Sequence, residues 1–184
     1  MDQDQPIVMQ VARFHSVKDH QTAIKAFDNV LKIVDNALLM LVGDGEERAA
    51  SETLVQSLGI SENVRFLGLR NDINTILPAA DIFMLSSLSE GISVTLLEAM
   101  ACTLPIVATD VGGNGEVVQH EVSGLLSPRG DWQQLAQNLA ILLQNPRMRQ
   151  GMAAAGHQRL QQHFTQSRMH DSYVSIYQQM LERT

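Results

Sequence analysis

The segment Ala37-Leu-Leu-Met-Leu-Val42 is apolar at every position and is followed directly by the turn Gly43-Asp-Gly45. A strand of this kind is covered on both faces, which is typical of a parallel sheet between two layers of helices. Further short apolar runs alternate with stretches of helical period, as in a sheet with crossover helices. We therefore expect an α/β, three-layer domain with a parallel sheet of about six strands, plus C-terminal helices. The other predicted strands are Ile7–Val11, Val64–Leu67, Asp81–Leu85, Pro105–Ala108 and, more weakly, Gly124–Ser127.

Two helices are predicted from apolar residues spaced three and four positions apart. Asp131 is suited to begin the second of them, with Gln134 at the capping-box position. The apolar positions are Ile24, Phe27, Val30, Leu31 and Val34 in the first helix and Leu135, Leu139, Leu142 and Leu143 in the second.

The last part of the chain differs, because no strand signal follows Pro146. An apolar stripe at i, i+3, i+4, i+7 and i+8 predicts a terminal helix that docks on another surface. Its residues are Tyr173, Ile176, Tyr177, Met180 and Leu181.

Composition excludes several classes of protein. The chain has 184 residues, of which 45% are hydrophobic, and a formal net charge of −7, so a general nucleic-acid or anionic-membrane binder is not expected. No apolar run approaches the roughly 20 residues of a transmembrane helix, and residues 1–5 do not resemble a signal peptide. The single cysteine, Cys102, fits a reducing compartment. We expect a cytoplasmic protein, with the inner face of a membrane as a further option for a longer chain.

Ligands of doubly wound sheets bind beyond the carboxyl ends of the strands. The loop after the first predicted strand carries Arg13 and Lys18, which together could clamp a diphosphate. By spacing alone they are also explained as solvated surface charges, although their position in an acidic chain favours the phosphate site. The turn Gly43-Asp-Gly45 lacks the full dinucleotide fingerprint, so a plain strand-to-helix turn is the simpler interpretation.

The strongest signal is the segment from Ser86 to Met100, after the fourth predicted strand. Ser93 is a predicted helix start, and the free amides of a first helical turn favour an anion. Glu98 shares a helix face with Val94 and Ala101 and would interrupt an apolar stripe. Because an unpaired buried carboxylate is costly, we expect Glu98 to meet a buried cation or to face a cleft where ribose hydroxyls satisfy it. The alternative is that Glu98 forms a structural hydrogen bond or salt bridge and has no role in ligand binding.

The remaining candidates carry weaker signals. Asn114 and Glu116 follow a glycine-rich turn, and capping of a helix is their preferred role. The histidines have no metal spacing, and His15 alone lies on the cationic loop. Cys102 lies in a predicted apolar helix and is expected in the core. No metal site is predicted.

Five motifs follow one another in order over about residues 7 to 165. They are Val11-Ala-Arg13 through Lys18, Leu41 through Gly45, Val64 through Gly68, Glu90 through Glu98, and Leu104 through Gly113. In this order they resemble the G-R-x4-K loop, the V-G-D-G turn, the v-x-F-x-G strand end, the E-x7-E signature and the later glycine turn of a known family. This is the GT-B-fold retaining glycosyltransferases, "glycosyl transferases group 1". The resemblance implies a Rossmann-like, C-terminal, donor-binding domain.

The family pattern implies a role for each matching position. Arg13 and Lys18 would neutralise the diphosphate of the donor as the sugar leaves, and Glu90 would bind hydroxyls of the donor sugar, so these three are the implied catalytic residues. Glu98 would bind the ribose. The other implied donor-binding residues are Gly43, Phe66, Leu67, Gly68, Leu69, Gly91, Ile92, Ser93, Val94 and Thr95. The implied hexosyltransferase-like reaction uses a UDP- or GDP-linked sugar, retains the anomeric configuration and needs no cofactor or metal.

Four positions depart from the family pattern. Ala12, Asp19 and Thr103 stand where glycine is usual, and Gly91-Ile-Ser93 replaces G-F-G. These departures concern the geometry of the donor loops and hence the sugar specificity.

We expect residues 1–164 to be the nucleotide-sugar-binding domain and residues 165–184 to be a helix that crosses to an N-terminal acceptor-binding domain absent from this sequence. The isolated chain should then bind a donor without transferring it, and its exposed terminal helix should favour self-association. Surface polysaccharide or a lipid-linked glycan is the acceptor expected by analogy.

Alternatives stay open. One is a non-catalytic nucleotide-sugar-binding subunit with a separate partner chain, and another is a nucleotide-sugar epimerase of GT-B shape. A phosphoacceptor receiver domain fits poorly, because it needs an acidic pair where Arg13 stands.

Overall fold

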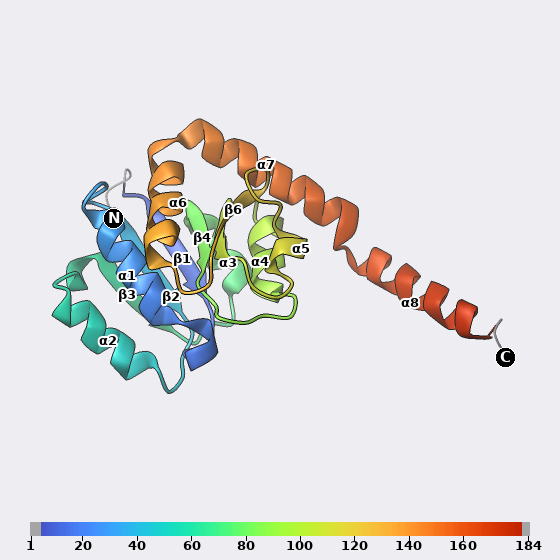
Figure 1. Cartoon of the computed structure of the whole chain (residues 1–184), viewed down its shortest axis with the longest axis horizontal. Coiled ribbons are helices and arrows are strands. Elements are labelled where there is room, and N and C mark those ends of the chain that lie inside the picture. Colours follow the sequence, from blue (N-terminus) through green and yellow to red (C-terminus); the bar gives the residue numbers. More distant parts are fainter. Residues whose placement is uncertain (1–4, 182–184) are drawn as a thin grey trace.

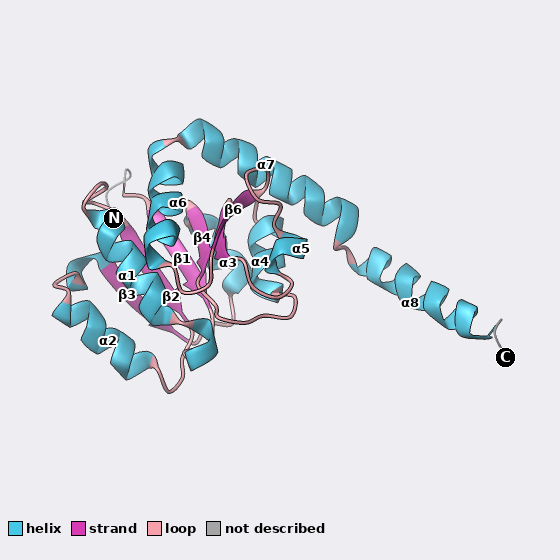
Figure 2. Cartoon of the chain, viewed as in Figure 1, coloured by secondary structure: helices cyan, strands magenta, loops and turns pink. Residues whose placement is uncertain are grey.

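The computed structural model describes residues 5–181 as a six-stranded sheet with helices on both sides (Figures 1 and 2). All strand pairs are parallel, in the order β3-β2-β1-β4-β5-β6. The predicted α/β fold with a parallel sheet is thus confirmed, and each predicted strand is correct to within one residue at either end. The strands are β1 (Ile7–Val11), β2 (Leu38–Val42), β3 (Val64–Gly68), β4 (Ile82–Leu85), β5 (Ile106–Thr109) and β6 (Gly124–Ser127).

Helices connect the strands and continue beyond the last one. They are α1 (His20–Leu31), α2 (Arg48–Ser57), α3 (Ile73–Ile76), α4 (Val94–Ala101), α5 (Asn114–Val117), α6 (Trp132–Gln144), α7 (Pro146–His163) and α8 (Gln166–Leu181). Short 3-10 turns lie at Ser16–Lys18, Ser61–Asn63 and Leu77–Ala79.

The structure explains why β2 is apolar at every position. Successive side chains of a strand point to opposite faces of the sheet, and in β2 both faces are covered by a core. Leu39 and Leu41 pack in the cluster shared with α1 and α6, whereas Leu38 and Met40 pack in the cluster shared with α4 and α5. A polar residue on either face of β2 would therefore enter one of the two cores.

The predicted helical faces point into the first of these cores. Ile24, Phe27 and Val30 of α1 are fully buried, as is Leu135 of α6. Asp131 begins α6 as predicted, because its Oδ1 accepts a hydrogen bond of 2.9 Å from the amide of Gln134. Leu31 and Val34 are only partly buried, and Val34 lies beyond the end of α1.

The C-terminal region contains two helices that differ in burial, since α7 packs on the fold and α8 does not. Pro146 lies at the start of α7, and Met152, Ala153 and Gly156 on this helix are buried against the rest of the fold. In α8 no residue is buried, and Figure 1 shows it extending away from the sheet. Among the described residues, no helix is long and apolar enough to cross a membrane.

Candidate donor site at the carboxyl ends of the strands

The strand order places a switch point between β1 and β4, because the chain continues from β1 to one side of the sheet and from β4 to the other. Ligands of open parallel sheets bind beyond the carboxyl ends of the strands at such a point. The loop after β1 carries Arg13 and Lys18, and the loop after β4 carries Glu90. The predicted catalytic residues therefore lie on the two loops that flank the switch point.

Glycines let these loops lie against their neighbours. Gly43 and Gly45 have φ angles of 136° and 151°, and a Cβ atom added to them would lie 2.0 Å from the carbonyl oxygen of Ala12 and 2.3 Å from that of Phe14. A Cβ atom on Gly112 would lie 1.8 Å from the carbonyl oxygen of Glu90. The glycine turns after β2 and β5 thus support the loops after β1 and β4 by backbone contact, a role that the spacing of the glycines alone did not reveal.

A cleft of about 470 Å³ opens at the ends of β1 and β2. Its lining residues are Val11, Ala12, Arg13, Val42, Gly43, Asp44, Leu69, Arg70, Ile73 and Thr95. Four predicted site residues, Arg13, Gly43, Leu69 and Thr95, are thereby brought to one cavity. The side chain of Arg13 is 72% exposed and lies 3.5 Å from Glu46, so its cation faces solvent with a weak, screened partner.

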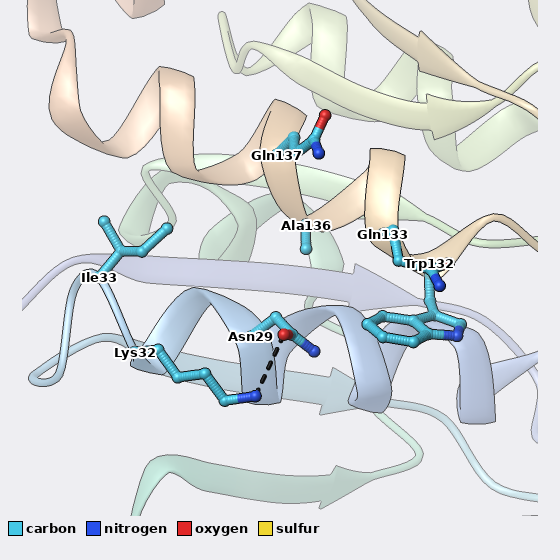
Figure 3. Close-up of a pocket in the computed structure, with 7 residues that line it drawn as sticks. All are labelled: Asn29, Lys32, Ile33, Trp132, Gln133, Ala136 and Gln137. Carbon is cyan, nitrogen blue, oxygen red and sulfur yellow. Dashed lines mark hydrogen bonds between the residues drawn. The ribbon is translucent and has the colours of Figure 1, made fainter.

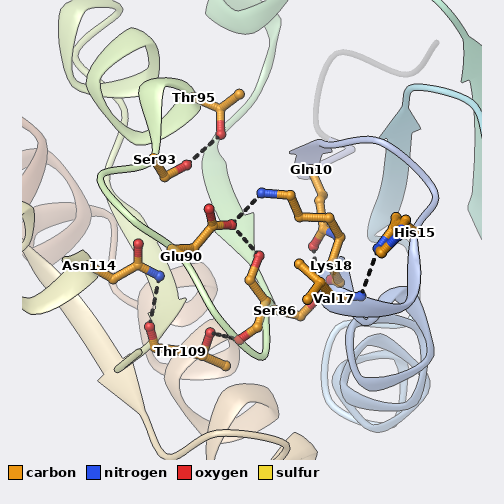
Figure 4. A network of polar contacts seen from close by, with 11 residues as sticks. Gln10, His15, Val17, Lys18, Ser86, Glu90, Ser93, Thr95, Thr109 and Asn114 are labelled. Carbon is orange, nitrogen blue, oxygen red and sulfur yellow. Dashed lines mark hydrogen bonds and ion pairs between the residues drawn. The ribbon is translucent and has the colours of Figure 1, made fainter. Parts of the chain in front are cut away.

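Lys18 has a different environment from Arg13. Its Nζ donates to Glu90 Oε1 at 2.5 Å, and Ser87 Oγ donates to the same oxygen at 2.5 Å. Figure 4 shows Lys18 and Glu90 directed toward each other from the two loops of the switch point. The carboxylate side chain of Glu90 is 8% exposed. The two cations predicted to act as one clamp are therefore paired with two different carboxylates in the free chain.

The start of α4 is where the sequence predicted it. Ser93 precedes its first turn, although the Ser93 hydroxyl lies 3.0 Å from that of Thr95 and does not cap a backbone amide. Ile92 and Val94 beside it are 52% and 64% exposed. The first turn of α4 thus faces the open side of the strand ends, where its amides and dipole favour an anion.

The prediction that Glu98 interrupts a buried stripe of its helix, and so could meet a buried cation, is wrong. The buried face of α4 consists of Leu96, Ala99 and Met100, while Glu98 lies on the exposed face with Val94. Nearly every other residue of this helix is apolar, so periodicity could not decide which face points inward. Glu98 is satisfied by solvent, and its role toward ribose stays a prediction.

The residues predicted to line a nucleobase separate in the structure. Leu69 is 78% exposed and lines the cleft. Phe66 packs instead on the α1 side of the sheet, with its ring 5.9 Å from that of Phe14 and the Arg48 guanidinium 5.9 Å from its centroid. Leu67 and Gly68 complete β3 and do not line the cleft. The alternation of strand side chains explains the separation.

The predictions for Asn114 and Cys102 need correction, whereas His15 lies on the cationic loop as expected. Asn114 does not cap α5; its buried Nδ2 donates to the carbonyl of Thr109 at 3.0 Å, and Gly113 precedes the helix. Cys102 is half-buried just beyond the end of α4 instead of within it, and burial, followed by the Glu98 carboxylate, raises the pKa of its thiol. His15 binds the amide of Val17 and thereby orders the cationic loop.

Two of the residues that replace the usual glycines adopt left-handed backbone conformations. Asp19 has a φ of 45°, and its side chain accepts a hydrogen bond from the amide of Thr22, which makes this conformation tolerable. Thr103, with a φ of 56°, follows the end of α4 at a position that favours glycine. Ala12 is not among the left-handed residues. Asp19 and Thr103 thus keep a backbone conformation that favours glycine, although neither residue is a glycine.

Sequence reasoning missed a buried polar pair beneath the switch point. Gln10 lies within β1 and Ser86 directly follows β4, and both side chains are fully buried. The available signal was Gln10 itself, a polar residue in an otherwise apolar predicted strand.

A second cavity, of about 320 Å³, lies between α1 and α6. Figure 3 shows the indole of Trp132 against α1, with Asn29, Lys32 and Ile33 along the same wall. It contains none of the predicted site residues.

Comparison with known proteins agrees with this geometry. The profile of the family described as "Glycosyl transferases group 1" matches residues 1–159. N-acetyl-alpha-D-glucosaminyl L-malate synthase of Bacillus anthracis is 33% identical over 98% of this chain and 47% of its own length. The lipopolysaccharide core biosynthesis glycosyltransferase LpsE of Rhizobium meliloti is 31% identical over 94% of this chain and 50% of its own length.

A solved structure extends the comparison to a bound ligand. Anabaena HepE in complex with UDP and glucose superposes with a TM-score of 0.83 at 26% identity, covering 98% of this chain and 48% of HepE. The chain therefore spans about half the length of the relatives it matches.

Proposed function

Because the chain belongs to the glycosyl transferases group 1 family, we propose that it is the donor-binding domain of an enzyme that transfers a sugar from a nucleoside-diphosphate sugar. The observation that carries this proposal is the cleft at the ends of β1 and β2, with Arg13 in its wall and the Lys18–Glu90 pair on the flanking loops. The complex of HepE with UDP and glucose supports a nucleotide-sugar ligand of this kind.

The chemistry of the site suits a diphosphate that gains charge as the sugar departs. Arg13 would bind phosphate oxygens through its guanidinium, and Lys18 would add a point charge. Glu90 would then exchange its bond with Lys18 for hydroxyls of the donor sugar, a role for which an acceptor-only carboxylate is suited. We propose that transfer is hexosyltransferase-like, retains the anomeric configuration and needs no metal ion or other cofactor.

The acceptor and the acceptor-binding domain belong to the same proposal. The described part of α8 places Tyr173, Ile176 and Tyr177 in solvent, at 55%, 52% and 62% exposure. An apolar stripe of this kind is a docking surface, and we assign it to an N-terminal acceptor-binding domain. The name of the Rhizobium relative favours a surface glycan as the acceptor.

Titration calorimetry of the isolated chain with UDP, GDP and their sugars tests the proposal. We expect one of the two nucleotides to bind, equally well with a metal chelator present, and no sugar to be transferred. Arg13→Ala should raise the dissociation constant about tenfold, because a hydrogen bond to a charged group is lost. Glu98→Ala should raise the dissociation constant about three- to tenfold on the same principle.

Two exposed residues provide matched controls. Lys32→Ala removes a cation that pairs with Asp28 at 3.4 Å on α1, and Glu62→Ala removes an exposed carboxylate; neither should alter binding. If no nucleotide binds, the proposed function is wrong. If a nucleotide binds but Arg13→Ala and Glu98→Ala behave like the controls, the function stands and the assignment of the site fails.

A further inference from the structure

The hydroxyl of Ser86 touches the loop that carries Lys18. Ser86 Oγ lies 3.0 Å from the carbonyl oxygen of Lys18 and 2.9 Å from that of Asp19. The Ser86 side chain is 0% exposed, so no water competes for these contacts. Figure 4 shows Ser86 in the same network as the Lys18–Glu90 pair. One buried hydroxyl thus reaches the backbone of the residue that supplies the cation.

Gln10 provides the partner that this hydroxyl needs. Its Oε1 lies 3.2 Å from Ser86 Oγ, and its buried Nε2 has no hydrogen-bond partner among residues 5–181. A hydroxyl has one hydrogen and cannot donate to three oxygens at once. With the amide turned over, Nε2 donates to Ser86 Oγ and frees the Ser86 hydrogen for the carbonyls of Lys18 and Asp19. The buried Gln10 therefore directs the Ser86 hydroxyl toward the loop.

The loop turns sharply at this point and is tied to the loop after β4. Asp19 is held at a φ of 45°, in the left-handed region that non-glycine residues rarely adopt. This conformation turns the chain between the 3-10 turn that ends at Lys18 and the start of α1. A second tie is the bond of 2.8 Å from the amide of Leu88 to the carbonyl of Val17. Both ties come from the loop after β4, so this loop helps to fix where Lys18 lies, together with the bonds within the Lys18 loop itself.

We propose that Ser86 is a positioning residue, which fixes the backbone of Lys18 so that its ammonium group lies within reach of the donor phosphates and of Glu90. The proposal rests on the proposed function, since it assigns Ser86 a part in the same donor site. Ser86 does not contact the donor; it acts through Lys18. A purely structural role, in which Ser86 only holds two loops of the fold together, makes a different prediction.

A double-mutant cycle in nucleotide binding separates the two roles. The wild-type chain is titrated with UDP and GDP, and the nucleotide that binds is then titrated against Ser86→Ala, Lys18→Met and the double variant. We expect Ser86→Ala to weaken binding about three- to tenfold in the wild-type background, the usual range for a buried hydrogen bond. In the Lys18→Met background we expect less than about a twofold effect, because the residue that Ser86 positions is then absent.

Ser123→Ala is the matched control. Ser123 is 1% exposed, and its hydroxyl donates to the carbonyl of Gln119 at 3.4 Å. It directly precedes β6, at the amino ends of the parallel strands, whereas Lys18 lies beyond their carboxyl ends. This variant loses the same kind of bond and should bind the nucleotide as the wild type does. Gln10→Met, which keeps a side chain of similar volume, provides a second variant if Ser86→Ala does not fold. It should weaken binding in the same direction, and its effect should also vanish with Lys18→Met.

Each outcome is decisive. If the wild-type chain binds neither UDP nor GDP, the proposed function fails and this inference fails with it. If the wild type binds and Ser86→Ala matches Ser123→Ala, the function survives and the positioning role is wrong. The role is equally wrong if the loss caused by Ser86→Ala persists in full in the Lys18→Met background.

Discussion

The glycine turns at the strand ends and α8 are the two extremes of packing in this molecule. At Gly112 a single added Cβ atom would lie 1.8 Å from the carbonyl oxygen of Glu90. In α8, by contrast, sixteen residues from Gln166 to Leu181 include no buried side chain. One added methyl group at Gly112 should therefore destabilise the fold more than the loss of all of α8. A helix without buried side chains is thus expected to contribute less to stability than a closely packed turn.

The largest effect is expected for Gly112→Ala. The new Cβ atom meets backbone, and Gly112 has a φ of 51°, which L-residues adopt at a cost. We expect the free energy of unfolding to fall by at least about 3 kcal/mol, measured by urea denaturation. Gly151→Ala is the control, because this residue of α7 has no atom within 4 Å of its added Cβ. It should be neutral or stabilising by about 0.5–1 kcal/mol. Similar values for the two variants would contradict the packing argument.

The second expected effect is a dependence of the free energy of unfolding on pH, caused by His20. His20 is buried at the start of α1 and stacks on Phe14 with ring centroids 3.9 Å apart. Neither of its ring nitrogens has a hydrogen-bond partner in the described part of the chain. Burial, followed by the charge of Lys18, lowers the pKa of His20 from 6.5 to about 4. Below pH 6.5 the unfolded chain therefore binds a proton on His20, whereas the folded chain binds it only near pH 4.

This difference makes the free energy of unfolding fall by up to about 3 kcal/mol as the pH drops from about 6.5 toward 4. Above pH 6.5 His20 is neutral in both the folded and the unfolded chain, so it causes no such loss. Urea denaturation across this range measures it. His20→Leu should flatten that part of the profile relative to the wild type. His170→Leu, a change on the exposed α8, should keep the wild-type slope. An unchanged slope in His20→Leu would show that carboxyl groups alone cause the acid sensitivity.

The smallest effect on stability is expected for removal of α8. A chain that ends after Phe164 keeps the side chain that packs against the α4-side core and, among the described residues, loses none that is buried. We expect the free energy of unfolding to change by less than about 1 kcal/mol, and sedimentation to show less self-association than for the full chain. A loss above about 2 kcal/mol would mean that α8 packs on the sheet domain in solution, and the comparison would fail.

The sequence predicted the strands well because a parallel sheet covered on both faces needs apolar residues at every strand position. It also placed Arg13, Lys18 and Glu90 at the ligand end, because they follow strands that run in the same direction. It failed at Glu98 and Phe66, where the face of an element decides the environment. In α4 apolar residues surround the helix, and β3 has alternating burial at the edge of the sheet, so neither pattern selected the cleft side.

The sequence by itself determined the fold class, the order of the motifs and the loops on which the candidate site lies, since all of these follow from local hydrophobic patterns and residue types. Only the tertiary structure decided which groups meet. It paired Lys18 with Glu90, 72 residues away, and it brought Ser86 beneath the backbone of Lys18. Such contacts depend on strand order and on the approach of separate loops, which no local pattern specifies. The glycine contact at Gly112 arises from the same cause, whereas the exposure of α8 was already expected from its unpartnered apolar stripe.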